Sequence, residues 1–321
     1  MRRVGIALVG LWGVAAVSAP FVAPHPVDLR FPELLSAPPT RLHVGAGGLV
    51  IHPWTLVDRL EQRYEVDTSR DVPLRWFSGG RLIGSADDGR APLLLLGADS
   101  LGHDVFSRLV FGARTSLTLA VAAALGALFI GAGAGGIAGY AGGPLDEVLM
   151  RASDFVMVLP AMYVVLALRA VMPLVLSPAT VFLLLAGIFA VVGAPFIARG
   201  VRAIVRAERQ LDYAVAAEAL GSSRARVLVR HLLPAAAGYM AVQLTLLIPA
   251  FIIAEATLSY VGLGFPDSIA SWGTMLHDAS ANVRVFADFP WLLSPAAAIF
   301  LVVLGLNLAL EGRRTGLESI R

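Results

Sequence analysis

Side chains able to carry out catalysis or to bind a metal are scarce in this 321-residue chain. It contains no Cys and no Lys, which excludes a thiolate metal site and a phosphate-binding loop of the G-x-x-x-x-G-K-[ST] type. Its six His occur at no spacing typical of metal ligands, and no G-x-S-x-G nucleophile motif is present. We therefore expect no catalytic, cofactor-binding or metal-binding residues. If a nucleotide powers this protein, another subunit must bind it.

One carboxylate, that of Glu255, lies well inside a long apolar run, and Ser259 follows it one helical turn later. Ionisable groups at membrane depth often mark ion or substrate pathways, so both residues are candidates for a gate or pathway. Two interpretations are open for Glu255. It could relay protons, or it could be a structural group that accepts hydrogen bonds from neighbouring hydroxyls.

The composition is that of an integral membrane protein. Hydrophobic residues make up 57% of the chain and the mean hydropathy is +0.75, far above the values of a soluble domain. Several uncharged runs reach the ~20 residues that cross a bilayer. We predict an all-α membrane protein with six transmembrane helices, at residues 4–24, 115–138, 155–172, 179–198, 236–263 and 289–310. A cleaved signal peptide is the competing interpretation of the first run, but that run is longer than an ordinary signal core.

These helices predict four parts of the chain, namely an N-terminal transmembrane helix (1–24), an exported lobe with an interfacial segment (25–112), a five-helix core (113–311) and a tail (312–321). Seven Arg lie in a loop of the core at 199–235, whereas the last outer loop holds only Arg284. By the positive-inside rule, this loop and both termini lie in the cytoplasm. The net charge of +2 is too small to indicate a nucleic-acid partner.

The lobe between the first two spans is rich in Pro at its start and carries two hairpin patterns. Residues 41–51 would turn at Gly47-Gly48, and residues 72–83 would turn at Gly79-Gly80. We expect a small β-containing lobe outside the membrane. Two functions are open for it, namely contact with a solute-binding protein or simple shielding of the pore mouth.

The cytoplasmic loop contains a helix, a glycine break and a second helix. Good helix formers occupy 211–220, and Gly221 stands where a residue of positive φ would end that helix. Either of the two following serines can cap a second, amphipathic helix over 224–233, before Pro234. A short bent element of this kind between two spans is suited to receive a partner protein at the membrane surface.

Small residues recur in the second predicted span. Gly131, Gly135 and Gly139 repeat every four residues, which allows a neighbouring backbone to approach closely. We interpret these glycines as a helix-packing face, either within this subunit or against a partner.

Four motifs resemble the permease subunits of ABC importers of the oligopeptide, dipeptide and nickel family, in particular the second membrane subunit. The cytoplasmic loop resembles the family's coupling loop at Val215, Ala216, Ala217, Gly221, His231, Leu233 and Pro234, with Glu218 and Leu220 inside the same stretch. Val215 stands where the family has Glu, and His231 where it has an aliphatic residue. The other motifs lie at 96–117, 139–154 and 255–276. In the first of them, Asp104 and Arg108 are spaced to pair on one helix face.

The resemblance implies a transport subunit of a bacterial inner membrane that forms half of a translocation path. Its implied partners are a homologous second permease subunit, two ATPase subunits that bind ATP and Mg²⁺, an external solute-binding protein and membrane lipid. The leading solute is a peptide, followed by nickel and sugars. Two alternatives from other classes are an ion-gradient-driven secondary transporter and a membrane scaffold that transports nothing.

Overall fold

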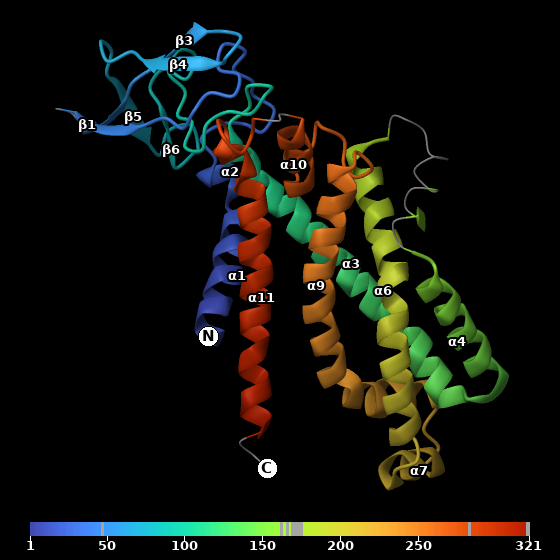
Figure 1. The fold of residues 1–321 in the computed structure, drawn as a ribbon. Helices are drawn as coiled ribbons and strands as arrows, with labels where there is room; N and C mark the ends of the chain where they lie inside the picture. Colours follow the sequence, from blue (N-terminus) through green and yellow to red (C-terminus); the bar gives the residue numbers. More distant parts are fainter. Residues whose placement is uncertain (46–47, 161–162, 165–166, 168–175, 282–283, 319–321) are drawn as a thin grey trace. The chain divides into compact units, whose positions relative to one another are not determined.

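The computed structural model describes residues 1–45, 48–160, 163–164, 167, 176–281 and 284–318 (Figure 1). The chain forms two compact units. One combines Met1–Leu117 with Glu255–Arg321, and the other is Thr118–Ala254. Each is described here by itself.

Four of the described helices are long and apolar enough to cross a membrane: Val105–Ala141, Pro178–Glu208, Arg224–Tyr260 and Pro290–Ala309. They contain the second and fourth predicted spans in full and most of the fifth and sixth. The first predicted span is divided between α1 (Arg2–Val17) and the single turn α2 (Ala19–Val22), because the helix breaks at Ser18 before Pro20. The third begins within α4 (Gly143–Val158), and most of its second half lies outside the described residues. The count of six spans therefore stays a prediction.

In the first unit, α1 packs along α11 (Ser294–Glu318) through two glycines. A Cβ placed on Gly5 would lie 2.5 Å from the carbonyl oxygen of Gly305, so only glycine permits this approach. Trp12 of α1 also meets Trp272 of α10 (Trp272–Ser280) edge to face, with ring centroids 5.2 Å apart. The N-terminus of α1 and the C-terminal end of α11 lie at the same end of this helix pair (Figure 1).

The segment between α2 and α3 carries the strands of the first unit. A four-stranded antiparallel sheet has the order β1-β2-β5-β6, formed by Leu42–Gly45, Gly48–Ile51, Val72–Trp76 and Ile83–Ser85. Its β1–β2 and β5–β6 pairs are the two hairpins predicted from the sequence. The first turn differs from the prediction, because Gly48 lies in β2 and pairs with Gly45, and Gly47 lies outside the described residues. A further antiparallel pair, β3 (Trp54–Asp58) with β4 (Arg63–Val66), was not predicted. Ile51, Ala91 and Leu93 form the core beneath the larger sheet.

In the second unit, the C-terminal part of α3 (Val105–Ala141) packs on α6 (Pro178–Glu208). The helix α6 begins at Ser177, whose hydroxyl accepts a hydrogen bond from the Thr180 backbone N–H, with Pro178 in the first turn. Phe189 of α6 stacks on Phe251 of α9 (Ala237–Tyr260) at a centroid distance of 5.4 Å. These contacts hold the segment that connects α6 to α9 on one helical scaffold.

Candidate functional site

The segment 212–234 has the predicted helix, break and helix. The first helix, α7, covers Asp212–Ala219, and Gly221 ends it with φ of +80°. The backbone N–H of Gly221 donates to Glu218 O at 2.9 Å, and that of Ser222 donates to Ala217 O at 3.1 Å. This is the hydrogen-bond pattern by which a glycine in the left-handed region closes a helix.

The second helix is continuous with the membrane helix that follows it. After a single α turn, α8 (Arg224–Val227), the chain forms a π turn at Leu228–Leu232 and a 3₁₀ turn at Leu233–Ala236, then enters α9. Pro234 has no N–H and its ring crowds the carbonyl four residues earlier, so the regular α pattern gives way around it. The proline therefore perturbs the helix without separating the loop from the span. Ser223 occupies the N-cap position but makes no side-chain capping bond.

Burial divides this segment into an inward and an outward side. Val227 and Leu232 are fully buried, and the side chains of Leu228 and Leu233 lie beside Gly136 of α3. In contrast, α7 buries only Ala214. Leu220 is 87% exposed and Val215 is 56% exposed. Of the loop residues singled out from the sequence, Val215, Ala216, Glu218, Leu220, Gly221 and Pro234 are exposed, and Ala217, His231 and Leu233 are partly buried.

Three side chains fasten α7 to the ends of α3 and α6. The Tyr140 hydroxyl, at the end of α3, donates to the Glu218 carboxylate at 2.7 Å. The Arg209 guanidinium, directly after α6, lies 4.7 Å over the Tyr140 ring and also donates to the Tyr140 carbonyl. A hydrogen bond to a carboxylate and a cation–π contact thus meet on one tyrosine.

An ionic contact ties the first turn of α4 to α6. Arg202 donates two hydrogen bonds to the Asp146 carboxylate, one of them from Nη2 at 2.6 Å, and Arg206 lies 3.9 Å from the same group. The Arg202 guanidinium holds the pKa of the Asp146 carboxyl below its usual range. Arg199 pairs with Asp154 further along α4.

Sequence reasoning matched Tyr140 and Asp146 to a family motif but assigned neither residue to the loop site. The excess of Arg at 199–235 was the available signal, since those guanidinium groups need acceptors. The acceptors of these guanidinium groups are set by how α3 and α4 pack against α6. No local sequence pattern shows that packing.

Glu255 is fully enclosed and has hydroxyl partners on both oxygens. Ser116 Oγ of α3 and Ser259 Oγ of α9 each donate to its carboxylate at 2.8 Å. The same two hydroxyls accept backbone N–H groups from Trp272 and Phe265, at 3.2 and 3.3 Å. The carboxylate therefore connects α3, α9 and the chain that enters α10.

The three packing glycines lie against one stretch of α6. A Cβ on Gly131 would lie 2.5 Å from the carbonyl oxygen of Ala194. The corresponding distance is 2.2 Å from Gly135 to Ala198 and 2.6 Å from Gly139 to Arg202. Ordinary contact begins more than 3 Å away, so each glycine allows direct backbone packing. The sequence left open whether these glycines pack within the subunit or against a partner protein. The structure shows them packed within the subunit, against α6.

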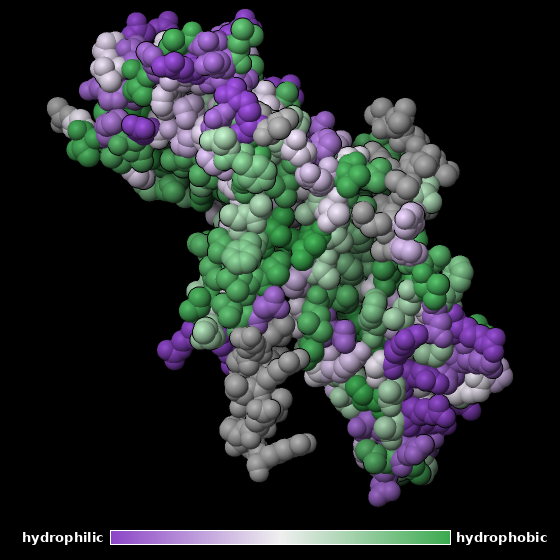
Figure 2. Space-filling view, viewed as in Figure 1, coloured by the Kyte–Doolittle hydropathy of each residue, from purple (hydrophilic) through white to green (hydrophobic). Residues whose placement is uncertain are grey.

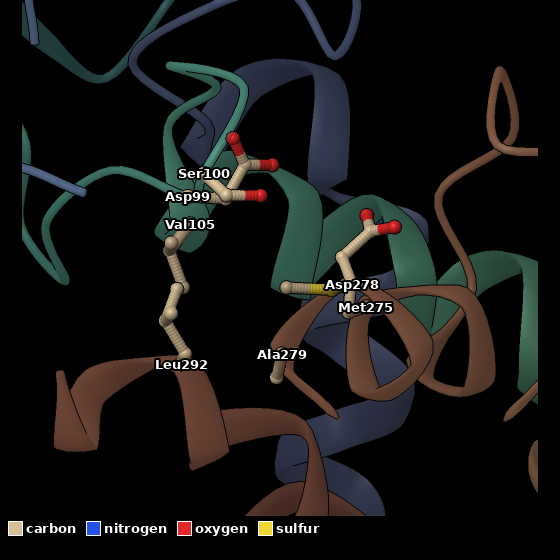
Figure 3. A pocket seen from close by; sticks show the side chains of 7 residues that line it. All are labelled: Asp99, Ser100, Val105, Met275, Asp278, Ala279 and Leu292. Atoms are coloured by element: carbon tan, nitrogen blue, oxygen red, sulfur yellow. The ribbon is translucent and has the colours of Figure 1, made fainter. Parts of the chain in front are cut away.

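The family motif before α3 forms a buried ionic cluster at the start of that helix. Arg108 pairs with Asp99 at 3.0 Å and with Asp278 of α10 at 3.5 Å, while Asp104 accepts from Ser107 and from His25. The pairing of Asp104 with Arg108 expected from their spacing was wrong. The Arg108 guanidinium pairs with Asp99 and Asp278 instead, and Asp104 contacts Ser107 and His25. A small cavity beside this cluster is lined by Asp99, Ser100, Val105, Met275, Asp278, Ala279 and Leu292 (Figure 3).

Comparison with known proteins assigns the family. The family described as "binding-protein-dependent transport system inner membrane component" matches residues 131–313. The chain belongs to this family. It is 37% identical to the oligopeptide transport system permease protein OppC of Bacillus subtilis, over 69% of this chain and 70% of the relative. It is 35% identical to the dipeptide transport system permease protein DppC of Alkalihalophilus pseudofirmus, over 69% of this chain and 70% of the relative.

A third relative is the glutathione transport system permease protein GsiD of Pectobacterium atrosepticum, 33% identical over 70% of this chain and 71% of its own length. These matches confirm the resemblance to the second membrane subunit of oligopeptide and dipeptide systems. The matched region of this inner membrane component contains the 212–234 segment, the packing glycines and Glu255.

Proposed function

We propose that this chain is a permease subunit of an ATP-driven peptide importer. Three relatives support the solute class, since their names specify oligopeptides, dipeptides and glutathione. In this proposal the chain pairs with a homologous second permease subunit and lines half of the path. A solute-binding protein delivers the peptide outside, and two ATPase subunits bind ATP and Mg²⁺ inside, because a chain without Lys cannot form the usual phosphate-binding loop.

The 212–234 segment is our candidate for the surface that the ATPase grips. The observation that supports it best is the outward side of α7, where Val215 and Leu220 are exposed beside the turn at Gly221. Exposed apolar side chains on a short helix are suited to a groove on a partner protein. Val215 stands where the family has Glu, so the corresponding contact would be apolar in this importer.

Movement of α7 would be transmitted to three helices. Tyr140 and Arg209 connect it to α3 and α6, and the second half of the segment continues into α9. A partner that displaces α7 therefore pulls on the ends of all three, which alternating access requires. The proposed orientation has this segment and both termini in the cytoplasm, in accord with the distribution of Arg.

The coupling proposal is tested by Gly221→Val with Gly221→Asn as its matched control. None of the described residues has an atom within 4 Å of a Cβ at this position, so both side chains fit, and only the φ of +80° discriminates between them. A β-branched residue strongly disfavours this conformation, at a cost of ~1–2 kcal/mol, whereas Asn tolerates it. We expect Gly221→Val to assemble but to hydrolyse ATP without proportionate peptide uptake in proteoliposomes, while Gly221→Asn keeps both. Normal uptake by Gly221→Val would refute the coupling assignment.

Copurification separates the alternatives. An ATPase that copurifies with the chain supports the importer. Uptake driven by an ion gradient in the absence of any ATPase would identify a secondary transporter, and a partner without transport activity would identify a scaffold.

A further inference from the structure

Three aromatic side chains are exposed on α2 and at the end of β5 in the first unit. Phe77 is 71% exposed, Trp76 is 54% exposed and Phe21 is 41% exposed. The rings of Phe21 and Phe77 lie 6.3 Å apart. We call Phe21, Trp76 and Phe77 the aromatic patch. No substrate or coupling role proposed above uses it.

Two hydrogen bonds hold the β5–β6 turn, which follows Trp76, against the end of α2. The backbone N–H of Leu82 donates to Phe21 O at 2.7 Å, and Arg81 Nη1 donates to Pro24 O at 2.6 Å. Both bonds join the β5–β6 turn to the end of the uncharged run that begins at Val4. Val17, one turn before Phe21 in that run, is 83% exposed. The patch therefore continues an apolar helix surface that faces outward.

The sheet adds to the same apolar surface. Alternation along the strands and the pairing register put Leu42, Val44, Leu74 and Trp76 on one face. The middle of this face is covered by Ala91 and Leu93, but Leu42 and Val44 stay exposed at 46% and 87%. This sheet lies on the side of the lobe toward α1, with β3 and β4 on the far side (Figure 1). Apolar residues gather along the near edge of the lobe and polar residues over its far side (Figure 2).

Internal packing does not explain the position of Phe77. Its φ is +53°, a conformation that bulky residues rarely adopt, and its ring is nevertheless mostly exposed. Aromatic side chains gather at the level of the lipid headgroups, where one part of the ring system is apolar and the surroundings are polar. A bilayer around the apolar run of α1 would have its boundary at the height of Phe21.

We propose that the aromatic patch lies in the headgroup–acyl boundary of the leaflet at which α1 ends, and anchors the lobe to the lipid surface. The partner is thus the bilayer itself. The proposal requires that α1 is embedded in the membrane, and it is independent of the solute and of the ATPase contact.

The test uses the full chain with its partner subunits in lipid nanodiscs. The absence of native Cys allows one environment-sensitive dye to be placed by Ser78→Cys, which leaves all three rings intact. Leu60→Cys is the control, since Leu60 is 94% exposed at the β3–β4 turn. Lipids that carry a nitroxide near the headgroup should quench the dye at position 78, with a blue-shifted emission, and should leave the dye at position 60 unaffected.

A second comparison tests whether the rings are responsible. Phe77→Asn suits the left-handed backbone, so its combination with Trp76→Ser should keep the turn and reduce the quenching at position 78. Equal quenching at positions 78 and 60 would overturn the proposal, as would quenching that is unchanged when the rings are removed. Shielding of position 78 only after addition of the solute-binding protein would overturn it in favour of a protein contact.

Discussion

The packing of α3 on α6 allows a prediction whose size can be worked out from the structure. In Gly135→Ala, the new methyl group would lie 2.2 Å from the carbonyl oxygen of Ala198, and the surrounding atoms are backbone that cannot rotate away. Reaching an ordinary contact requires the helices to separate by roughly 1 Å or more, and overpacking of this kind costs ~1–3 kcal/mol. The higher helix propensity of Ala returns at most ~1 kcal/mol.

Gly133→Ala is the matched control in the same helix, because within the described part of the chain no atom lies within 4 Å of a Cβ at that position. This variant gains the higher helix propensity of Ala, but its methyl group does not collide with α6. We expect Gly135→Ala to lower the unfolding free energy by about 1–2 kcal/mol and Gly133→Ala to leave it unchanged or slightly raised. The measurement is unfolding of the purified chain in mixed micelles by increasing SDS, followed by circular dichroism. Equal shifts for the two variants would show that close packing at Gly135 does not contribute to stability.

Three further predictions concern hydrogen-bonded groups. Tyr140→Phe removes the bond to the exposed carboxylate of α7, at a cost of about 1 kcal/mol, and should speed hydrogen exchange in α7. Tyr239→Phe, whose hydroxyl donates to Phe196 O away from α7, should not. Because hydroxyls surround Glu255, Glu255→Gln should leave the pH profile of uptake unchanged, and a changed profile would indicate a protonation role. Burial lowers the pKa of His25, but the Asp104 and Asp88 carboxylates raise it more, so the net pKa is raised. The resulting stability is present below the unfolded pKa of ~6.5 and is lost as pH rises through the folded value. Thermal stability should therefore fall as the pH rises above ~6.5 in the wild type but lack this fall in His25→Gln; parallel curves would contradict the assignment.

Properties that depend on short stretches of sequence could be read before the structure. Four of the predicted spans lie in helices long enough to cross a membrane, and both Gly-containing hairpins pair as expected. The break at Gly221 was also predictable, because a positive φ is a local property of one residue and its neighbours. The β3–β4 pair was missed, since its turn contains no Gly.

What the tertiary structure alone decided is which distant groups meet. The sequence contained Arg108 and several acids, but only packing brought Asp99 and Asp278 to it in place of Asp104. It likewise contained Glu255 without showing that Ser116, 139 residues earlier, would donate to it. Helix formation and hydrophobicity are determined over a few residues, so sequence alone determined four of the spans and the bent loop. Pairings across the chain depend on how whole helices pack, and only the folded arrangement determines them.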